Sequence, residues 1–105
     1  MVSKAYKIPF NIPFNKVIFN LTRLDIIGSL DDEQPIPFTE LRDVLELTSG
    51  NLASHLRVLE KHDIISVTKT FRGKKPCTLI SLTINGEENF KTLKEWFWQV
   101  FLEGN

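Results

Sequence analysis

Residues 48–62 read TSGNLASHLRVLEKH, and the spacing of the leucines in this segment predicts a short amphipathic helix over 50–62. At about 100° per residue, Leu52, Leu56 and Leu59 fall on one narrow stripe, as in a helix that packs against a core. The opposite side of the helix carries mainly polar and basic side chains, namely Asn51, Ser54, Arg57 and Lys61. An ordinary surface helix more often carries Glu and Lys on its outer face, so we interpret this segment as a DNA recognition helix.

Two kinds of DNA contact are expected from this helix. Arg suits guanine, Asn suits adenine, and Ser reaches either a base or a phosphate. The candidate groove contacts are therefore Asn51, Ser54 and Arg57. Thr48 or Ser49 can cap the helix start, where the helix dipole favours a phosphate, and Lys61 adds a basic phosphate contact. His55 lies at the edge of the leucine stripe, where a half-buried structural histidine and a DNA contact fit the pattern equally well.

The residues before this helix predict a second helix and a turn. Thr39 can cap a helix over 40–47 whose apolar residues share one face. The buried stripe of this helix consists of Leu41, Val44 and Leu45. The segment 48–50, TSG, separates the two helices with its glycine at the tight corner, so the pair forms a helix-turn-helix.

Further upstream, the sequence predicts a first helix and a short strand. The helix covers 21–30, and its inward residues are Leu21, Leu24, Ile27 and Leu30. Ile36-Pro37 is short and bounded by proline, which suits an edge strand that leads into the next helix. Arg23 either contacts the DNA backbone or pairs with the acidic residues of the first helices.

After residue 63 the pattern changes from helical to extended. Residues 64–71 and 77–83 are rich in β-branched side chains and predict a β-hairpin. Its tip, over 69–76, is basic, because no acidic residue lies between Ser66 and Ser81. The phosphate candidates in it are Lys69, Arg72, Lys74 and Lys75. An ordinary solvated turn is the alternative, but the uncompensated charge favours contact with phosphates.

The last helix is predicted over 85–102 and is apolar around much of its circumference. Its stripe consists of Phe90, Leu93, Trp96, Phe97, Val100 and Phe101, and Trp98 and Leu102 add apolar surface on another side. Such a helix needs a second partner besides its own domain, and a copy of the same chain provides one through a two-fold interface. We therefore expect a homodimer, with a helix buried inside a monomer as the competing interpretation.

An extended N-terminal arm is predicted over residues 1–14. The segment IPFN occurs twice in succession, at 8–11 and 12–15, and each proline disfavours a helical conformation of the residue before it. Because exposed Phe10 and Phe14 would be a liability on a lone monomer, the arm is expected to pack on its own domain or on a partner subunit. A free tail is the alternative.

Composition and charge fit a single domain, over 15–103, that follows the arm. The chain has 105 residues, of which 42% are hydrophobic, and its single Cys77 excludes an internal disulfide. A membrane span or secretion signal is not apparent, so a cytoplasmic, nucleoid-associated protein is expected. The net charge is zero, but residues 48–84 hold six basic residues against two acidic ones. This segregation gives the recognition helix and the hairpin a positive surface.

Catalysis and cofactors are not indicated. The chain has no glycine-rich phosphate loop and no motif that joins a nucleophile, a base and an orienting acid, so we expect no enzyme and no cofactor. The spacing of His55, His62 and Cys77 fits no recognised metal-ligand pattern. Cys77 as a redox sensor is conceivable because its neighbourhood is basic, although a lone strand cysteine is more often a small packed residue.

The order helix, strand, helix, turn, helix, basic hairpin, helix resembles a winged helix-turn-helix, which is mainly α with a small β-hairpin. Over residues 15–101 the chain resembles small stand-alone MarR-like transcriptional regulators of archaea and bacteria. The motifs that carry this resemblance are FTEL (38–41), LTSGNLASHL (47–56), LE (59–60), FRGKKP (71–76) and LTING (82–86). Two positions depart from the family, since Asp63 stands where a glycine is usual and Cys77 where a basic residue is frequent.

The resemblance implies a homodimer that binds duplex DNA near promoters. The second helix of the helix-turn-helix would lie in the major groove, and the wing would contact the minor groove or the backbone. Two alternatives stay open. The domain can instead be a protein–protein interaction module that works through its aromatic C-terminal helix, or a metal- or redox-responsive switch. The sequence does not identify a small-molecule effector.

Overall fold

The computed structural model describes residues 16–103, so the predicted arm over 1–14, with Phe10 and Phe14, lies outside the described residues. In chain order the elements are α2 (Leu21–Asp32), β1 (Ile36–Pro37), α3 (Phe38–Val44), α4 (Ser49–Lys61), β2 (Ile65–Arg72), β3 (Lys75–Leu82), α5 (Ile84–Trp98) and the π-helix η1 (Gln99–Glu103). A further helical turn at 16–18 precedes them. The predicted order of elements, mainly α with a small β-hairpin, is confirmed.

The three strands form one antiparallel sheet in the order β1-β3-β2. Ile36 and Pro37 of β1 pair with Ile80 and Leu79 of β3, so the proline lies on the edge strand, where a missing N–H is tolerated. β2 and β3 pair along their whole length, from Ile65↔Leu82 to Arg72↔Lys75. The long hairpin therefore extends well beyond the short edge strand.

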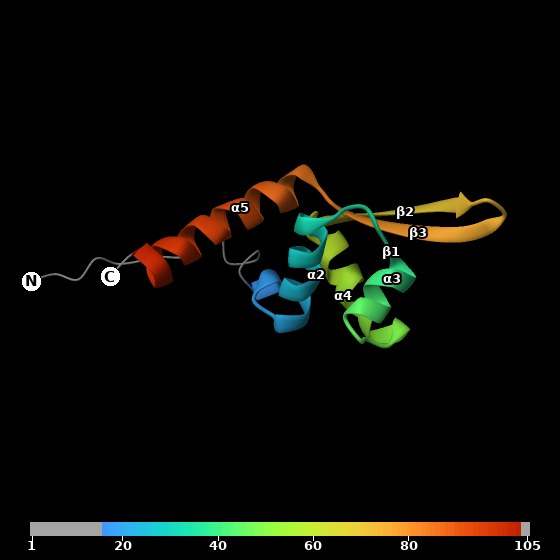
Figure 1. Cartoon of the computed structure of the whole chain (residues 1–105), viewed down its shortest axis with the longest axis horizontal. Helices are drawn as coiled ribbons and strands as arrows, with labels where there is room; N and C mark the ends of the chain where they lie inside the picture. Colours follow the sequence, from blue (N-terminus) through green and yellow to red (C-terminus); the bar gives the residue numbers. More distant parts are fainter. Residues whose placement is uncertain (1–15, 104–105) are drawn as a thin grey trace, which may run out of the picture.

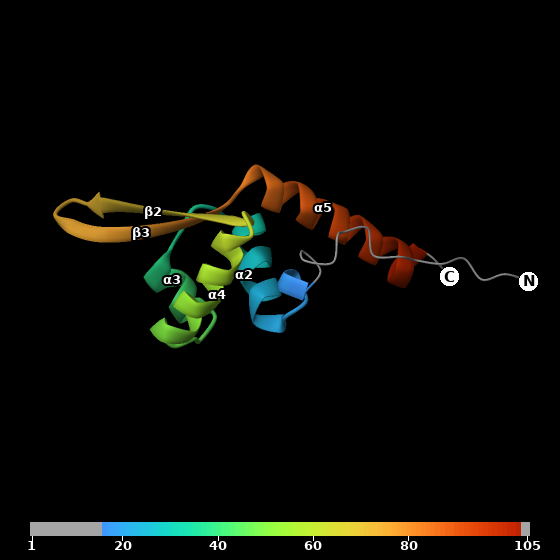
Figure 2. The ribbon, with the colours of Figure 1, turned by 180° about the vertical axis from the view of Figure 1, so that it is seen from behind.

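The core lies where the helices meet the inner end of the sheet. Figure 1 shows α2, α3 and α4 gathered beside the sheet, with the hairpin extending to one side and α5 to the other, and Figure 2 shows the same arrangement from behind. The predicted leucine stripe of α4 is confirmed, because Leu52, Leu56 and Leu59 are buried in the core. α4 is thus held by one face, and its opposite face is free to contact a partner.

The inward face of α2 differs from the prediction at its first turn. Three of the four predicted inward residues pack in or against the core, namely Leu24, Ile27 and Leu30. Leu21 is 83% exposed, and Ile26 is buried instead. Arg23 shares the helical stripe of Ile26, and its Nε donates a hydrogen bond to the Val17 carbonyl. Because Arg23 is charged, the apolar pattern of the sequence does not reveal the stripe of Arg23 and Ile26, and it points to Leu21 instead.

α3 is shorter than predicted and begins earlier. It begins at Phe38, with Pro37 in the N-cap position and no side-chain cap, so the prediction that Thr39 caps this helix was wrong. Leu41 is buried and Leu45 packs against the core, but Val44 is 69% exposed, contrary to the prediction. Because the helix ends at Val44, only the edge that carries Leu41 and Leu45 reaches the core.

The turn between α3 and α4 is made without the predicted glycine corner. Glu46, with φ of 54°, adopts the left-handed conformation there. Gly50 lies inside the first turn of α4, where an added Cβ would meet no atom within 4 Å. The helix-turn-helix itself is confirmed, but its reversal uses a non-glycine residue.

The last helix begins one residue earlier than predicted and changes its hydrogen-bonding pattern near its end. α5 covers Ile84–Trp98, and Gln99–Glu103 continue it as a π-helix. The Thr83 hydroxyl accepts a hydrogen bond from the Gly86 N–H at 2.9 Å and donates to the Asp63 carbonyl at 2.6 Å. This double contact fixes the direction in which α5 leaves the sheet.

Candidate nucleic-acid interface

The start of α4 is held in place by its own cap. The Thr48 hydroxyl accepts a hydrogen bond from the Asn51 N–H at 3.1 Å, so Thr48, one of the two predicted alternatives, is the N-cap. Ser49 is the first helical residue, and its hydroxyl accepts from Arg42 Nη1 at 3.2 Å. Backbone N–H groups at this end point outward together with the positive end of the helix dipole, an arrangement suited to a phosphate.

Arg42 was not among the sequence-predicted contacts. It lies on α3, yet its guanidinium reaches the first turn of α4 and also pairs with Asp43, Nε to Oδ1 at 2.8 Å. The side-chain hydrogen bond to Asp43 and the carboxylate charge raise the pKa of Arg42. In the sequence Arg42 is the one basic residue within an acidic segment. Its contact with Ser49 arises because the turn between α3 and α4 is tight.

The outer face of α4 carries the predicted groove candidates. Asn51, Ser54, Arg57 and Lys61 are all exposed. Arg57 Nη2 donates to Ser54 Oγ at 3.3 Å, one helical turn toward the N-terminus. The two side chains therefore form one polar unit, in which Ser54 steadies the guanidinium while leaving its other donors free to meet an acceptor.

His55 lies beside this face and not on it. It is half-buried, and its Nδ1 lies 3.3 Å from Arg23 Nη1 on α2. Burial, and secondarily the charge of Arg23, lower the pKa of His55, so the neutral ring accepts this hydrogen bond. The contact links α4 to the carbonyl of Val17 through Arg23. This contact favours the structural interpretation of His55. Arg23 has the same role, because it contacts both His55 and the Val17 carbonyl.

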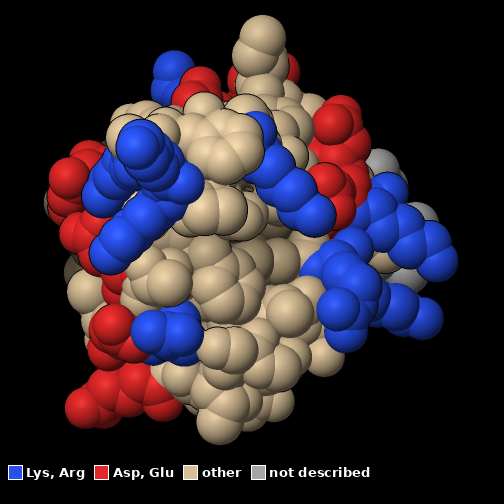
Figure 3. Space-filling view, turned by 90° about the vertical axis from the view of Figure 1, so that its right-hand side faces the viewer, with Lys and Arg blue, Asp and Glu red and all other residues tan. Residues whose placement is uncertain are grey.

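The wing is a regular hairpin with a two-residue turn. β2 ends at Arg72 and β3 begins at Lys75, with Gly73 at φ of 61° as the first turn residue. A glycine at this position suits the tight turns whose twist matches paired strands. The side chains of Lys69, Arg72, Lys74 and Lys75 are exposed. Seen from the wing end, Lys and Arg side chains project around a largely uncharged surface, and Asp and Glu lie toward its margins (Figure 3).

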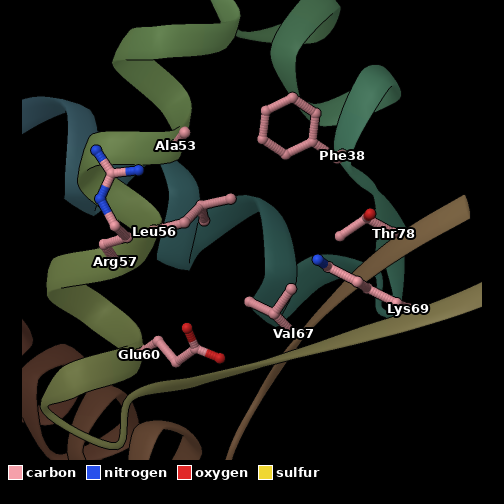
Figure 4. A pocket seen from close by; sticks show the side chains of 8 residues that line it. All are labelled: Phe38, Ala53, Leu56, Arg57, Glu60, Val67, Lys69 and Thr78. Carbon is pink, nitrogen blue, oxygen red and sulfur yellow. The ribbon is translucent and has the colours of Figure 1, made fainter.

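A groove of about 400 Å³ separates α4 from the wing. Figure 4 shows Arg57 and Glu60 projecting from α4 on one side and Lys69 from β2 on the other, with Val67 and Leu56 between them. The groove thus has an apolar floor, Arg57 and the acidic Glu60 on the α4 wall, and Lys69 on the wing wall. The structure thus brings together, in one groove, α4 and the wing, which the sequence predicted as two separate DNA contacts.

The C-terminal helix places the predicted dimerisation residues in two groups. Leu93 is buried, and Phe90 and Trp96 pack partly against the core. Toward the end of the helix the apolar side chains are exposed, namely Phe97, Trp98, Phe101 and Leu102. The rings of Phe97 and Phe101 lie 4.5 Å apart, and Trp96 meets Phe101 edge to face at 6.4 Å. Val100 is half-buried.

Other kinds of site have little support within residues 16–103. No group of three or more His, Cys, Asp or Glu side chains in this part of the chain could hold a metal ion. Cys77 is a free, half-buried cysteine on β3. Among the same residues, none of the helices is long and apolar enough to cross a membrane.

Comparison with known proteins agrees with this geometry. The pattern that defines the winged helix DNA-binding domain family matches residues 22–100. An uncharacterized protein of Methanocaldococcus jannaschii is 30% identical over 76 residues, which are 72% of this chain and 83% of that protein. A transcriptional regulator homologue from Pyrococcus horikoshii OT3 has a similar structure, with a TM-score of 0.70, 32% identity and coverage of 83% of this chain and 90% of that chain.

A DNA complex has the same fold. The MepR–DNA complex of S. aureus matches with a TM-score of 0.74 at 16% identity, over 88% of this chain and 75% of that chain, which is a likeness of fold alone. Together these matches confirm the winged helix DNA-binding domain that the sequence predicted. The family model and the MepR complex concern DNA-binding proteins, in agreement with the expectation that the chain is not an enzyme.

Proposed function

The chain belongs to the family of winged helix DNA-binding domains, and we propose from this premise that it is a transcriptional regulator that binds duplex DNA as a homodimer. The observation that carries the proposal is the position of α4 beside the wing. An exposed polar helix face and a basic hairpin flank one groove, with Arg57 on one wall and Lys69 on the other. Duplex DNA offers a groove for the helix and phosphates for the basic side chains.

α4 is the element that enters the major groove. That groove is about 12 Å wide and admits an α-helix, whose outward side chains then meet the base edges. Asn51, Ser54 and Arg57 supply the donors and acceptors for such readout, and Arg57 is held by its hydrogen bond to Ser54. The helix start, with Thr48, Ser49 and the neighbouring Arg42, meets the backbone that borders the groove.

The wing meets the next segment of the duplex. Lys69, Arg72, Lys74 and Lys75 are exposed, and no acidic side chain accompanies them along the hairpin. Each phosphate that they neutralise releases counterions, so binding should weaken steeply with salt. Lys61, near the end of α4, adds a further contact of this kind.

The homodimer forms through α5. The C-terminal end of α5 and the π-helix η1 that continues it expose Phe97, Trp98, Phe101 and Leu102 within two turns, an apolar surface that a monomer would leave in water. A two-fold interface buries the same surface on both copies and places two recognition helices on one duplex. This apolar end also supports the second candidate function, a protein–protein interaction module in which α5 is the working surface.

One experiment separates the two candidates. A duplex recovered from a random-sequence pool by the purified full chain is labelled, and binding is followed by fluorescence anisotropy across a salt series, with mass from light scattering. The regulator requires a steep salt dependence, with a slope of roughly 0.9 per neutralised phosphate, and a mass of two chains. If no duplex is recovered and none binds at low salt, the regulator is rejected and the interaction module takes its place.

A further inference from the structure

The tip of the wing has two chemically different faces. Phe71 pairs with Pro76 across the hairpin, and the next pair outward is Arg72 with Lys75. Because successive residues of a strand point to opposite faces, Phe71 and Pro76 share one face, and Arg72 and Lys75 share the other. At the tip of the wing, an apolar pair on one face is thus next to a basic pair on the opposite face.

Phe71 is unusually open for an aromatic residue. It is 69% exposed, although its strand begins with the buried Ile65. Burying an aromatic side chain of this size is strongly favourable, so its exposure marks a surface that gains from a partner. Four basic residues and no acidic one surround it along the hairpin, so the partner that fits is a polyanion with an apolar interior, which describes duplex DNA.

The direction of Phe71 follows from its strand neighbours. Lys69 lies two residues before it, on the same face of β2, and lines the groove opposite Arg57. In the complex proposed above, with α4 in the major groove, the DNA backbone that borders the major groove would cross the protein groove between Arg57 and Lys69. Phe71 lies about 6.8 Å further along the strand, at 3.4 Å per residue, on the far side of that backbone. The far side of a backbone that borders the major groove is the minor groove.

We propose that Phe71 is an apolar wedge, which the wing inserts into the minor groove so that it partly unstacks a base step there. The inference rests on the proposed DNA-binding function and specifies one contact within it. A groove about 6 Å wide admits one side chain from the tip of the hairpin and not the whole two-stranded ribbon, and Phe71 is exposed at that tip. Arg72 and Lys75, on the opposite face, then remain directed to the phosphates.

A wedge of this kind adds sequence preference without a base-specific hydrogen bond. Apolar side chains inserted from the minor groove partly unstack a base step, and the cost depends on how easily that step deforms. Flexible pyrimidine–purine steps should therefore be favoured where the wing lands, at a position that α4 does not touch. The preference should depend on the size of residue 71.

The test compares Phe71→Thr, which keeps strand propensity, with Phe71→Leu, which keeps an apolar group, and with Val44→Thr as a matched control. Val44 is also 69% exposed, but it lies beside Asp32, Glu33 and Glu40. The probe is the duplex that the wild-type chain selects from a random pool. Affinity and its salt slope are measured by anisotropy, and the wing position is mapped by hydroxyl-radical footprinting of the minor-groove sugars.

For Phe71→Thr we expect about a tenfold loss of affinity, an unchanged salt slope and loss of protection at the minor-groove sugars under the wing. Phe71→Leu should fall between it and the wild type, and Val44→Thr should match the wild type. An unchanged affinity and footprint in Phe71→Thr would overturn the wedge while leaving the proposed function intact. So would a loss of affinity accompanied by a change in mass, which would make Phe71 a protein contact. If the wild type selects no duplex, the proposed function fails first.

Discussion

Gly86, in the first turn of α5, lies directly against the backbone of Ile64. A Cβ added to Gly86 would overlap the Ile64 carbonyl oxygen and come within 3.0 Å of its carbonyl carbon. The same carbonyl accepts a hydrogen bond from the Thr83 N–H at 3.0 Å, and the Thr83 hydroxyl, which donates its proton to the Asp63 carbonyl at 2.6 Å, lies 3.2 Å away. The start of α5 is therefore held against Ile64, which lies between the end of α4 and the first strand of the wing.

We predict that Gly86→Ala destabilises the domain, because the Ile64 carbonyl cannot move aside for a methyl group without losing its hydrogen bond from the Thr83 N–H. The expected loss in the free energy of unfolding is about 1 to 3 kcal/mol, measured by thermal or urea denaturation. Gly28→Ala is the matched control. An added Cβ at Gly28 has open space within α2, so this change should be neutral or stabilising. Equal stabilities for the two variants would contradict the close approach.

A second prediction concerns the cap of the recognition helix. Thr48→Ala removes the acceptor of the Asn51 N–H and should cost about 1 kcal/mol of stability, read from urea denaturation. Thr48→Ser keeps the hydroxyl and should retain most of that stability. DNA affinity should fall with Thr48→Ala, because the frayed first turn no longer holds Ser49 and Asn51. A stable Thr48→Ala variant would mean that the cap does not hold the helix start.

The third prediction is a change in salt dependence. Changing Lys74 and Lys75 to glutamine should flatten the plot of log affinity against log salt by roughly 0.9 for each phosphate that is no longer neutralised. Lys91→Gln is the control, because Lys91 is exposed on α5, away from the wing. If the variant with glutamine at positions 74 and 75 binds with the same salt slope as the wild type and the Lys91→Gln control, the wing lysines do not contact the DNA backbone.

The fourth prediction follows from the lowered pKa of His55. Because burial and Arg23 disfavour the charged ring, the unfolded chain binds more protons here than the folded chain does. Stability from this group is fully present above its unfolded pKa of about 6.5 and declines as the pH falls below it. His55→Gln should therefore lose less stability than the wild type between pH 7.5 and 5.5, in urea denaturation at each pH. An equal loss would mean that His55 does not titrate differently in the folded state.

The sequence was most informative for elements whose own residue pattern determines both their secondary structure and the face that packs in the core. The leucine stripe of α4 and the β-branched strands of the wing are local signals, and both elements formed within one or two residues of their predicted bounds. Leu21 and Val44 were misplaced because the apolar periodicity of one segment shows neither that Arg23 shares the buried stripe of α2 nor that α3 ends at Val44. Arg42 was missed for the same reason, since its contact with Ser49 is set by the turn between two helices.

The last prediction tests whether α5 builds the dimer. Phe97 and Phe101 lie in ring contact on the exposed end of the helix, so glutamate at both positions would place charges in the proposed interface. In light scattering the double variant should have the mass of one chain at concentrations where the wild type has the mass of two. Its affinity for DNA should drop, because one recognition helix replaces two on the duplex. Ile84→Thr is the control, since Ile84 is exposed at the other end of α5. If the double variant stays dimeric, a surface other than the end of α5 joins the two copies; if it becomes monomeric and binds DNA as well as before, the dimer is not needed for recognition.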